Sequence, residues 1–207
     1  MAVSRPLLIA TSNEDKLEEV RDLLSDLPFR ILDLGDFPDL DVIEETGSSF
    51  SKNAALKASG YALQTGELTL ADDSGLEVDA LGGAPGVLSA RYSGKNASDL
   101  ERIEKLLAEL KKADKRNRSA RFVAAIAVAN SQGKILHISR GRCEGTIALS
   151  PRGKAGFGFD PIFVPRGYNN TFAELGSEIK NQISHRSRAL KQARDHLIGL
   201  TRHLRDG

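Results

Sequence analysis

The stretch LLIATSNEDKLEEVRDLL, residues 7–24, joins a predicted strand to a predicted helix through a short polar turn. Leu7–Thr11 is an apolar run, and the apolar residues after the turn recur at helical spacings of three and four, at Leu17, Val20 and Leu24. Either Ser12 or Asn13 can cap this helix by accepting a hydrogen bond from a first-turn N–H group. A strand that leads into a helix N-terminus in this way offers backbone N–H groups to an anion.

Similar patterns predict the other elements of the chain. They are a strand at 30–34, a helix at 48–64 closed by Gly66, a buried strand at 68–71 that ends at two aspartates, a helix opened by a capping box at 98–101, a hairpin at 120–144 that turns at 131–134, and a C-terminal helix. The predicted core faces are Leu100, Ile103, Leu107 and Leu110 on the helix after 98, and Leu190, Ala193, Leu197, Leu200 and Leu204 on the last helix.

This order of elements predicts the fold class. Strands that alternate with helices, followed by a hairpin, are typical of an α/β protein with a mixed sheet. The sequence contains no internal repeat and no linker, so we expect residues 1–207 to form a single domain. If that domain has two lobes, we expect continuous strands to join them.

The composition excludes several classes of protein. Hydrophobic residues make up 40% and charged residues 28% of the 207 residues, which is normal for a globular protein. A net charge of +1 gives no general attraction to nucleic acid or to an anionic membrane. No apolar run approaches the roughly 20 residues of a membrane-spanning helix, and the first residues do not resemble a signal peptide. The single cysteine, Cys143, fits a reducing compartment, so we expect a cytoplasmic protein without a nucleic-acid or membrane partner.

Familiar catalytic motifs are absent from the sequence, which has no P-loop, no GxGxxG and no HExxH. Four histidines and one cysteine are too scattered along the chain for a tetrahedral zinc site. Ser74 has no evident histidine partner for a nucleophilic triad. Five polar stretches remain as candidates for a functional site.

The first two polar stretches indicate phosphate binding and a polar cleft. Thr11–Lys16 combines hydroxyl groups, N–H groups of a helix start and a lysine, which can bind a polyphosphate, although a plain helix cap needs the same residues. After Glu44 and Glu45, positions 50, 53, 54, 57 and 61 share one helical face, so Asn53 and Lys57 interrupt an apolar stripe. That pattern suits a helix that lines a polar cleft, unless Lys57 simply extends to water.

The third stretch places Asp72 and Asp73 directly after an apolar run. Mg²⁺ prefers one or two carboxylates together with the phosphate oxygens of a substrate. Adjacent residues of a strand point to opposite faces, so one carboxylate can hold the metal while the other orients or deprotonates a water molecule. The alternative interpretation is an acidic turn.

The last two stretches offer groups that can recognise a ring. In GFGFDP, residues 156–161, the glycines let the backbone approach a ligand, an exposed phenylalanine can stack on a purine, and Asp160 can accept hydrogen bonds from ring N–H groups. The alternative is a pair of core aromatics in a tight bend. Lys180 lies nearby in sequence, and His185 and Arg186 fall in the first turn of a helix, where the dipole disfavours cations. These cations indicate an anionic or carbonyl-rich ligand, unless they lie on a solvated surface.

Together the five stretches resemble the inosine triphosphate pyrophosphatase family, whose members remove non-standard purine nucleotides. The resemblance covers residues 8–190 and keeps the order TSNEDK, EETGSSFSKNAALKA, ADDSGLEVDALGGAPGVLSARYSG, GFGFDPIF and SHRSRAL. Phe159 stands where the family usually has tyrosine or tryptophan before Asp-Pro. The resemblance implies an α/β fold in which helices flank an elongated mixed sheet and two lobes form a central cleft.

The resemblance also implies a reaction, the Mg²⁺-dependent hydrolysis of ITP, dITP and XTP to the monophosphate and pyrophosphate by a homodimer. The residues carried over for the triphosphate are Thr11, Ser12, Asn13, Glu14, Asp15 and Lys16, with Lys57 as a further cation. Glu44 and Asp73 would bind the metal, Asp73 would also be the catalytic base, and Glu45 or Asp72 can share or exchange the metal role. The residues carried over for the rest of the substrate are Ser74, Phe157, Gly158, Phe159, Asp160, Lys180, His185 and Arg186.

Two other functions fit parts of the pattern. A pyrimidine-nucleotide pyrophosphatase of the related Maf type would use similar chemistry with another base pocket, and the GFGFD and SHR stretches argue against it. A nucleotide-binding or RNA-binding module without catalysis is disfavoured by the near-zero net charge and by the adjacent aspartates, because acidic groups repel phosphate unless a metal is bound.

Overall fold

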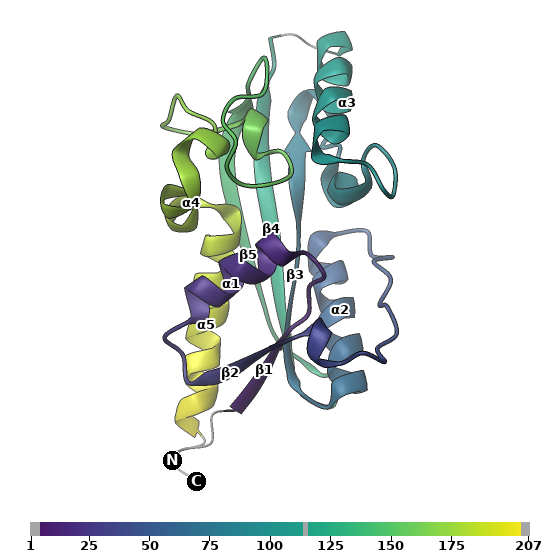
Figure 1. Ribbon diagram of the computed structural model, residues 1–207, viewed down its shortest axis with the longest axis vertical. Helices are drawn as coiled ribbons and strands as arrows, with labels where there is room; N and C mark the ends of the chain where they lie inside the picture. The colour runs from purple at the N-terminus through teal and green to yellow at the C-terminus, as the bar shows by residue number, and fades with distance from the viewer. Residues whose placement is uncertain (1–4, 114–115, 204–207) are drawn as a thin grey trace. The chain divides into compact units, whose positions relative to one another are not determined.

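The computed structural model describes residues 5–113 and 116–203. The helices and strands are, in chain order, β1 (Arg5–Ile9), α1 (Glu14–Leu24), β2 (Phe29–Asp33), α2 (Phe50–Thr65), β3 (Leu68–Val78), α3 (Asp99–Lys112), β4 (Ser119–Ala129), β5 (Ile135–Ile147), β6 (Phe163–Pro165), α4 (Phe172–Ile183) and α5 (His185–His203) (Figure 1). The strands form one sheet in the order β2-β1-β3-β4-β5-β6. β1 pairs in parallel with β2 and β3, whereas β5 and β6 are antiparallel, so the predicted α/β fold with a mixed sheet is confirmed.

The chain divides into two compact units. Unit 1 comprises Met1–Asp73, Ala124–Gly141 and Ser187–Gly207, and unit 2 comprises Ser74–Val123 and Arg142–Arg186. The boundaries fall inside β3, β4 and β5, so each of these strands passes from one unit into the other without a break. This confirms the expectation of two lobes joined by continuous strands, whereas the central cleft stays a prediction.

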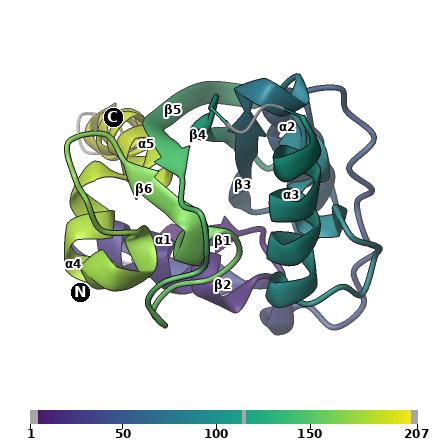
Figure 2. The ribbon, with the colours of Figure 1, turned by 90° about the horizontal axis from the view of Figure 1, so that it is seen from above.

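The core of unit 1 lies between the sheet and two helices. Leu7 and Ile9 of β1 and Leu68 and Leu70 of β3 are buried against α1 and α5. Figure 2 shows α1 and α5 on one side of this part of the sheet and α2 on the other. The predicted face of α5 is confirmed at Leu190, Ala193 and Leu197, which are buried, and Leu200 packs against the same cluster; Leu204 lies outside the described residues.

β3 is longer than its sequence pattern predicts. The prediction that the strand ends at Asp72 and Asp73 is wrong, because it continues to Val78 and nearly every residue along it is buried. The two carboxylates do not interrupt it, since each finds a partner on a different helix, as described below. Because side chains of a strand alternate between faces, Asp72 and Asp73 point to opposite sides of the sheet.

Unit 2 has a separate core, built on the end of β3 and on α3. Leu76 and Val78 are fully buried in a cluster with the aromatic residues Phe122, Phe159, Phe163 and Phe172. The predicted capping box of α3 is confirmed, with Ser98 and Glu101 bonded to each other's backbone N–H groups. The prediction for its core face is wrong at Leu100, which is 58% exposed, because the buried stripe of α3 is formed by Ile103, Leu106 and Leu110.

α4 has no counterpart among the predicted elements. It begins with a capping box between Thr171 and Glu174, but Gly176 lies at φ 78° and breaks the regular helix after one turn. This left-handed residue explains why no continuous helical period is visible in the sequence. Within residues 5–113 and 116–203, no helix is both long enough and apolar enough to cross a membrane.

Candidate active site

The helix start of α1 carries the predicted phosphate-binding stretch in unit 1. Asn13 is the N-cap, and its side-chain oxygen accepts a hydrogen bond from the backbone N–H of Lys16 at 2.9 Å. Thr11 supports this turn by accepting a hydrogen bond from the N–H of Asn13. The Lys16 Nζ atom lies 3.1 Å from Asp72 Oδ2, and the Asp72 side chain is only 2% exposed. A cation and a helix N-terminus therefore lie together where the polyphosphate was predicted.

The hydroxyl and carboxylate groups of the same stretch are open to solvent. Ser12, Glu14 and Asp15 are exposed, and a hollow of about 410 Å³ beside them is lined by residues of α1 and of the chain after β2. The lining residues are Thr11, Ser12, Glu14, Leu17, Glu18, Arg21, Asp33, Leu34 and Gly35. The turn before α1 therefore has room for a ligand next to its N–H groups.

Asn53 of α2 connects the acidic loop after residue 43 to Asp73. Its Nδ2 atom donates a hydrogen bond to Asp73 Oδ2 at 2.9 Å, and its Oδ1 atom accepts one from the N–H of Gly47 at 2.7 Å. Asn53 is fully buried and Asp73 is 5% exposed. The presence of this polar residue in an apolar stripe is explained by its side-chain amide, whose NH₂ group and oxygen both form hydrogen bonds.

Lys57, one turn further along α2, does not extend to water. Its Nζ atom lies 2.6 Å from Glu45 Oε1, and its side chain is 11% exposed, so the solvent interpretation is wrong. Burial lowers the pKa of Lys57, but the nearby carboxylates of Asp72, Glu45 and Asp73 outweigh it and raise the pKa above its usual value. Lys57 therefore stays charged within a cluster of acids.

Asp73 has a strongly perturbed carboxyl group. Burial raises its pKa to about 6; the charge of Lys57 and the hydrogen bond from Asn53 oppose this, and the charge of Glu45 adds to it. A carboxylate whose pKa lies near neutrality is suited to accept a proton from water at cellular pH. Perturbed acids of this kind are concentrated at functional sites.

The structure distinguishes the two glutamates of the acidic loop. Glu44 is exposed, whereas Glu45 is half-buried, contacts Lys57 and acts electrostatically on Asp73. Among the residues that the structure describes, no group of three or more His, Cys, Asp or Glu side chains is arranged to hold a metal ion. Mg²⁺ does not require such a group, because it is commonly bound by one or two carboxylates with water and substrate phosphate completing the shell. The oxygen donors of Asp73 and Glu45 fit that requirement.

In unit 2, a buried ion pair holds the GFGFD loop. Lys180 Nζ lies 2.6 Å from Asp160 Oδ2, and the two side chains are 5% and 3% exposed. The same Asp160 oxygen accepts a hydrogen bond from the backbone N–H of Phe157 at 3.1 Å. Lys180 Nζ also lies 4.3 Å from the centre of the Phe157 ring, close enough for a cation–π interaction. The N–H of Gly158 donates to Asp99, which lay outside the predicted site.

His185 and Arg186 open α5 and are buried, so the solvated-surface interpretation is wrong for both. Arg186 is 2% exposed, donates a hydrogen bond to Ser74 Oγ at 2.9 Å and lies 5.5 Å from the centre of the Phe157 ring. The His185 ring stacks on Phe122 with centroids 4.7 Å apart. Ser74, Phe157 and Arg186 are thus brought together within unit 2, as the sequence motifs predicted.

Phe159 differs from the exposed aromatic that the sequence suggested. It is 4% exposed and belongs to the core cluster of unit 2, so its ring packs inside the protein. Phe157 is half-buried and is the ring of this loop that lies beside Lys180 and Arg186. Gly156 is required by close packing, because a Cβ atom there would lie 2.2 Å from Asp160 Oδ2, and its φ of +74° is left-handed.

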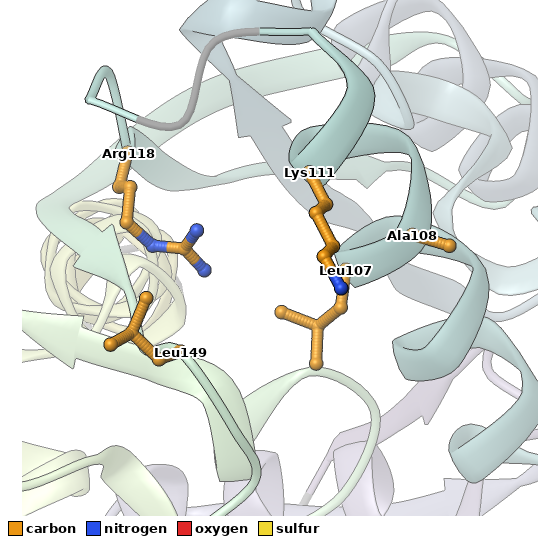
Figure 3. A pocket seen from close by; sticks show the side chains of 5 residues that line it. All are labelled: Leu107, Ala108, Lys111, Arg118 and Leu149. Carbon is orange, nitrogen blue, oxygen red and sulfur yellow. The ribbon is translucent and has the colours of Figure 1, made fainter.

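Unit 2 also has a hollow, and none of the predicted site residues lines it. It has a volume of about 510 Å³ and is lined by Leu107, Ala108, Lys111, Arg118 and Leu149. Figure 3 shows Leu107 and Lys111 of α3 on one side of the opening and Arg118 and Leu149 on the other, with Ala108 further back on the helix. It contains no carboxylate and none of the predicted site residues, so it offers nothing for the predicted chemistry.

Comparison with known proteins identifies the family. The model of the Ham1 family matches residues 7–196, which is nearly the whole chain. The chain belongs to the Ham1 family. This agrees with the resemblance found in the five polar stretches of the sequence.

Relatives in the Ham1 family cover almost the full length of the chain. A protein of Desulforamulus reducens named dITP/XTP pyrophosphatase is 47% identical over 197 residues, covering 95% of this chain and 98% of that protein. A protein of Geobacter sulfurreducens with the same name is 50% identical, covering 92% and 96%. The structure of a HAM1 protein from Coxiella burnetii superposes with a TM-score of 0.87 at 47% identity, covering 94% of this chain and 99% of that one.

Proposed function

We propose that this protein hydrolyses non-standard purine nucleoside triphosphates (dITP, ITP, XTP and dXTP) to the monophosphate and pyrophosphate, and so removes them from the nucleotide pool. The observation that carries the proposal is Asp73, a buried carboxyl group that Asn53 holds by a hydrogen bond and whose pKa of about 6 responds to the charges of Lys57 and Lys16. Relatives of similar length named dITP/XTP pyrophosphatase support the choice of substrate.

Unit 1 supplies the groups for the chemical step. The N–H groups at the start of α1 and the ammonium groups of Lys16 and Lys57 attract the negative triphosphate. Asp73 accepts a proton from the attacking water, whose oxygen adds to phosphorus while the α–β anhydride bond breaks. Asn53 holds the Asp73 carboxylate in place by donating to its Oδ2 atom, which leaves Oδ1 for the water.

We further propose Mg²⁺ as the cofactor, held by Asp73 together with Glu45. The family resemblance implied Glu44 for this role. We prefer Glu45, because Glu44 is exposed whereas Glu45 lies against Lys57. When bound, Mg²⁺ would neutralise phosphate charge and stabilise the leaving pyrophosphate. Glu45 can turn from Lys57 to the cation without losing charge compensation, because both partners are cationic.

Unit 2 supplies groups for recognising the base. Phe157 offers a half-buried ring for stacking, and Arg186 and Lys180 lie beside that ring as hydrogen-bond donors. A purine with a 6-oxo group can accept from such donors, whereas adenine presents an amino group and would leave a buried donor without its bond. This mismatch explains how ATP, the abundant nucleotide, would be rejected.

A turnover panel tests the proposal. Purified protein with Mg²⁺ is given dITP, XTP, ATP, GTP, dTTP or UTP, and pyrophosphate is assayed separately from phosphate, with and without EDTA. We expect pyrophosphate from dITP and XTP, little from the others, and loss of activity with EDTA. Preference for dTTP or UTP would indicate a pyrimidine enzyme of the Maf type, and binding without turnover would indicate a nucleotide-binding module. Activity that survives EDTA would contradict the role of Mg²⁺.

Two further expectations from the resemblance remain proposals. We propose that the protein is a homodimer, which light scattering coupled to gel filtration tests directly. We also propose that it acts in the cytoplasm, which its one buried cysteine and its nucleotide substrates support. Cell fractionation tests the second proposal.

A further inference from the structure

Asp99, at the start of α3, holds the backbone of the loop that carries Phe157. The N–H of Gly158 donates a hydrogen bond to Asp99 Oδ2 at 2.5 Å, across 59 residues of sequence. The carbonyl group on the other end of the same peptide unit, that of Phe157, accepts a hydrogen bond from the N–H of Asp160 at 3.3 Å. The peptide unit after Phe157 is therefore fixed at both ends, which sets the direction in which the Phe157 ring leaves the backbone.

Asp99 is not needed to cap its own helix. Ser98 and Glu101 form the capping box of α3, in which each side chain accepts a hydrogen bond from the other's backbone N–H group. The Asp99 carboxylate also gains from its place in the first helical turn, where the dipole favours an anion. Its bond to Gly158 is thus an additional task.

Arg102 keeps the Asp99 carboxylate in position. The Arg102 Nη2 atom pairs with Asp99 Oδ1, and its Nη1 atom donates to the carbonyl groups of Ala90 and Ala97 at 2.7 and 2.8 Å. The guanidinium group is therefore fixed by the chain before α3, and it leaves Asp99 Oδ2 for Gly158. Since Asp99 is 41% exposed, this bond is not simply a consequence of burial.

The same loop contacts both Lys180 and Arg186, through the Phe157 ring and the Asp160 carboxylate. Lys180 and Asp160 fix the loop from its buried side, and Asp99 fixes it from its solvent side. Gly158 lies at φ +62°, a left-handed conformation that needs such support to keep a single geometry. A shift of this peptide would move Phe157 relative to both cations.

We propose that Asp99 is a positioning residue for recognition of the base: through the N–H of Gly158 it holds the Phe157 ring where a 6-oxopurine can stack beside Lys180 and Arg186. The inference rests on the proposed function. Asp99 belongs to unit 2, as Phe157, Lys180 and Arg186 do, and its bond is to the loop that carries Phe157. We therefore expect it to affect binding of the base and not the chemical step.

The test compares Asp99→Ala with Glu101→Ala, a matched control at the same helix start. Glu101 makes the hydrogen bonds of the capping box to Ser98, so its loss affects the helix start without removing the bond to Gly158. For each protein we would measure KM and kcat for dITP and dATP, the Kd of dIMP without Mg²⁺, and the thermal midpoint. Asp99→Ala is expected to raise the KM for dITP and the Kd of dIMP about tenfold, to lower the preference for dITP over dATP, and to change kcat by less than about twofold.

The control and a conservative variant keep the proposal falsifiable. Glu101→Ala should leave KM and Kd at wild-type values, and Asp99→Asn, which retains an acceptor oxygen, should recover most of the loss. If Asp99→Ala binds dIMP like the wild type, or if Glu101→Ala weakens binding equally, the proposal is overturned. Failure of the wild-type protein itself to hydrolyse dITP would instead refute the proposed function, and this inference with it.

Discussion

Each unit contains a buried aspartate close to a lysine, and the two pairs are built differently. In unit 2, Lys180 contacts Asp160 directly at 2.6 Å, and both side chains are at least nine-tenths buried. In unit 1, Asp72 is matched by Lys16, but its neighbour Asp73 receives an amide N–H from Asn53, and Lys57 contacts Glu45. The closed pair in unit 2 fixes the shape of a loop. The open arrangement in unit 1 leaves Asp73 with a pKa raised to about 6, able to take up and release a proton.

The difference teaches that residue types alone do not separate a structural acid from a catalytic one. When a buried carboxylate contacts a cation, removing either partner destabilises the protein strongly, and the carboxylate has little tendency to take up a proton. A buried carboxylate that lacks a contacting cation lowers the stability of the protein, and its raised pKa suits it to catalysis.

The largest expected effect is the loss of turnover in Asp73→Asn. The amide keeps the shape of the side chain but cannot accept a proton, so we expect kcat to fall about 10⁴-fold, at the upper end for a general base. The fold should survive, as judged by circular dichroism. The matched change in unit 2, Asp160→Asn, should weaken binding of dITP more than turnover. Turnover above a tenth of wild type in Asp73→Asn would move the base role to Asp72 or a glutamate.

The next largest effect is on stability, in Lys180→Met. This change removes an ammonium group that contacts a buried carboxylate, and we expect it to lower the free energy of unfolding by about 3–5 kcal/mol. Lys57→Met should lower it by about 1 kcal/mol, because its partner Glu45 is 26% exposed and can be hydrated. Urea unfolding measures both. Equal losses of unfolding free energy in the two variants would contradict the difference between the buried pair of Lys180 and the partly hydrated pair of Lys57.

The pH dependence of stability gives a third test. Since burial raises the pKa of Asp73 to about 6 from an unfolded value of 3.8, the folded protein binds this proton more tightly than the unfolded chain. The stability that the folded protein gains by binding this proton is fully present below about pH 4 and is lost as the pH rises through 6. At neutral pH this lowers the free energy of unfolding by up to about 3 kcal/mol. Asp73→Asn should therefore match the wild type at pH 4 and exceed it at pH 7.5. No gain at pH 7.5 would contradict the raised pKa.

The smallest of these effects is on selectivity, in Arg186→Ala. Loss of a buried donor beside Phe157 should raise the KM for dITP and lower the preference for dITP over ATP about 30-fold, or about 2 kcal/mol, with less effect on kcat. Steady-state kinetics with both nucleotides measure it. Unchanged rejection of ATP together with an unchanged KM would remove Arg186 from base recognition.

Features set by neighbouring residues were predictable from the sequence. The capping role of Asn13 and the capping box at Ser98 and Glu101 follow from side chains and N–H groups within three residues of each other. The fold class also followed, since it depends on the order of apolar periods. The site stretches could be selected because their polar residues interrupt apolar runs, as Asn53 interrupts α2.

Features set by distant partners were not predictable. β3 continues through Asp72 and Asp73 because Lys16 and Asn53 receive the two carboxylates, and both partners come from other elements. The tie between Asp99 and Gly158 spans 59 residues and leaves no local pattern. Which of Glu44 and Glu45 contacts Lys57 depends on how the loop turns, which residue spacing does not determine, and the metal ligand among them stays a prediction.

The alternation of β3 also restricts how its gene can change. Gain or loss of a single codon between positions 68 and 73 would shift the strand by one residue and exchange the faces of Asp72 and Asp73. The acid that now meets Asn53 would then face Lys16, and each would lack its present partner. In-frame insertions and deletions should thus be confined to turns such as 92–97, while this segment varies only by substitution.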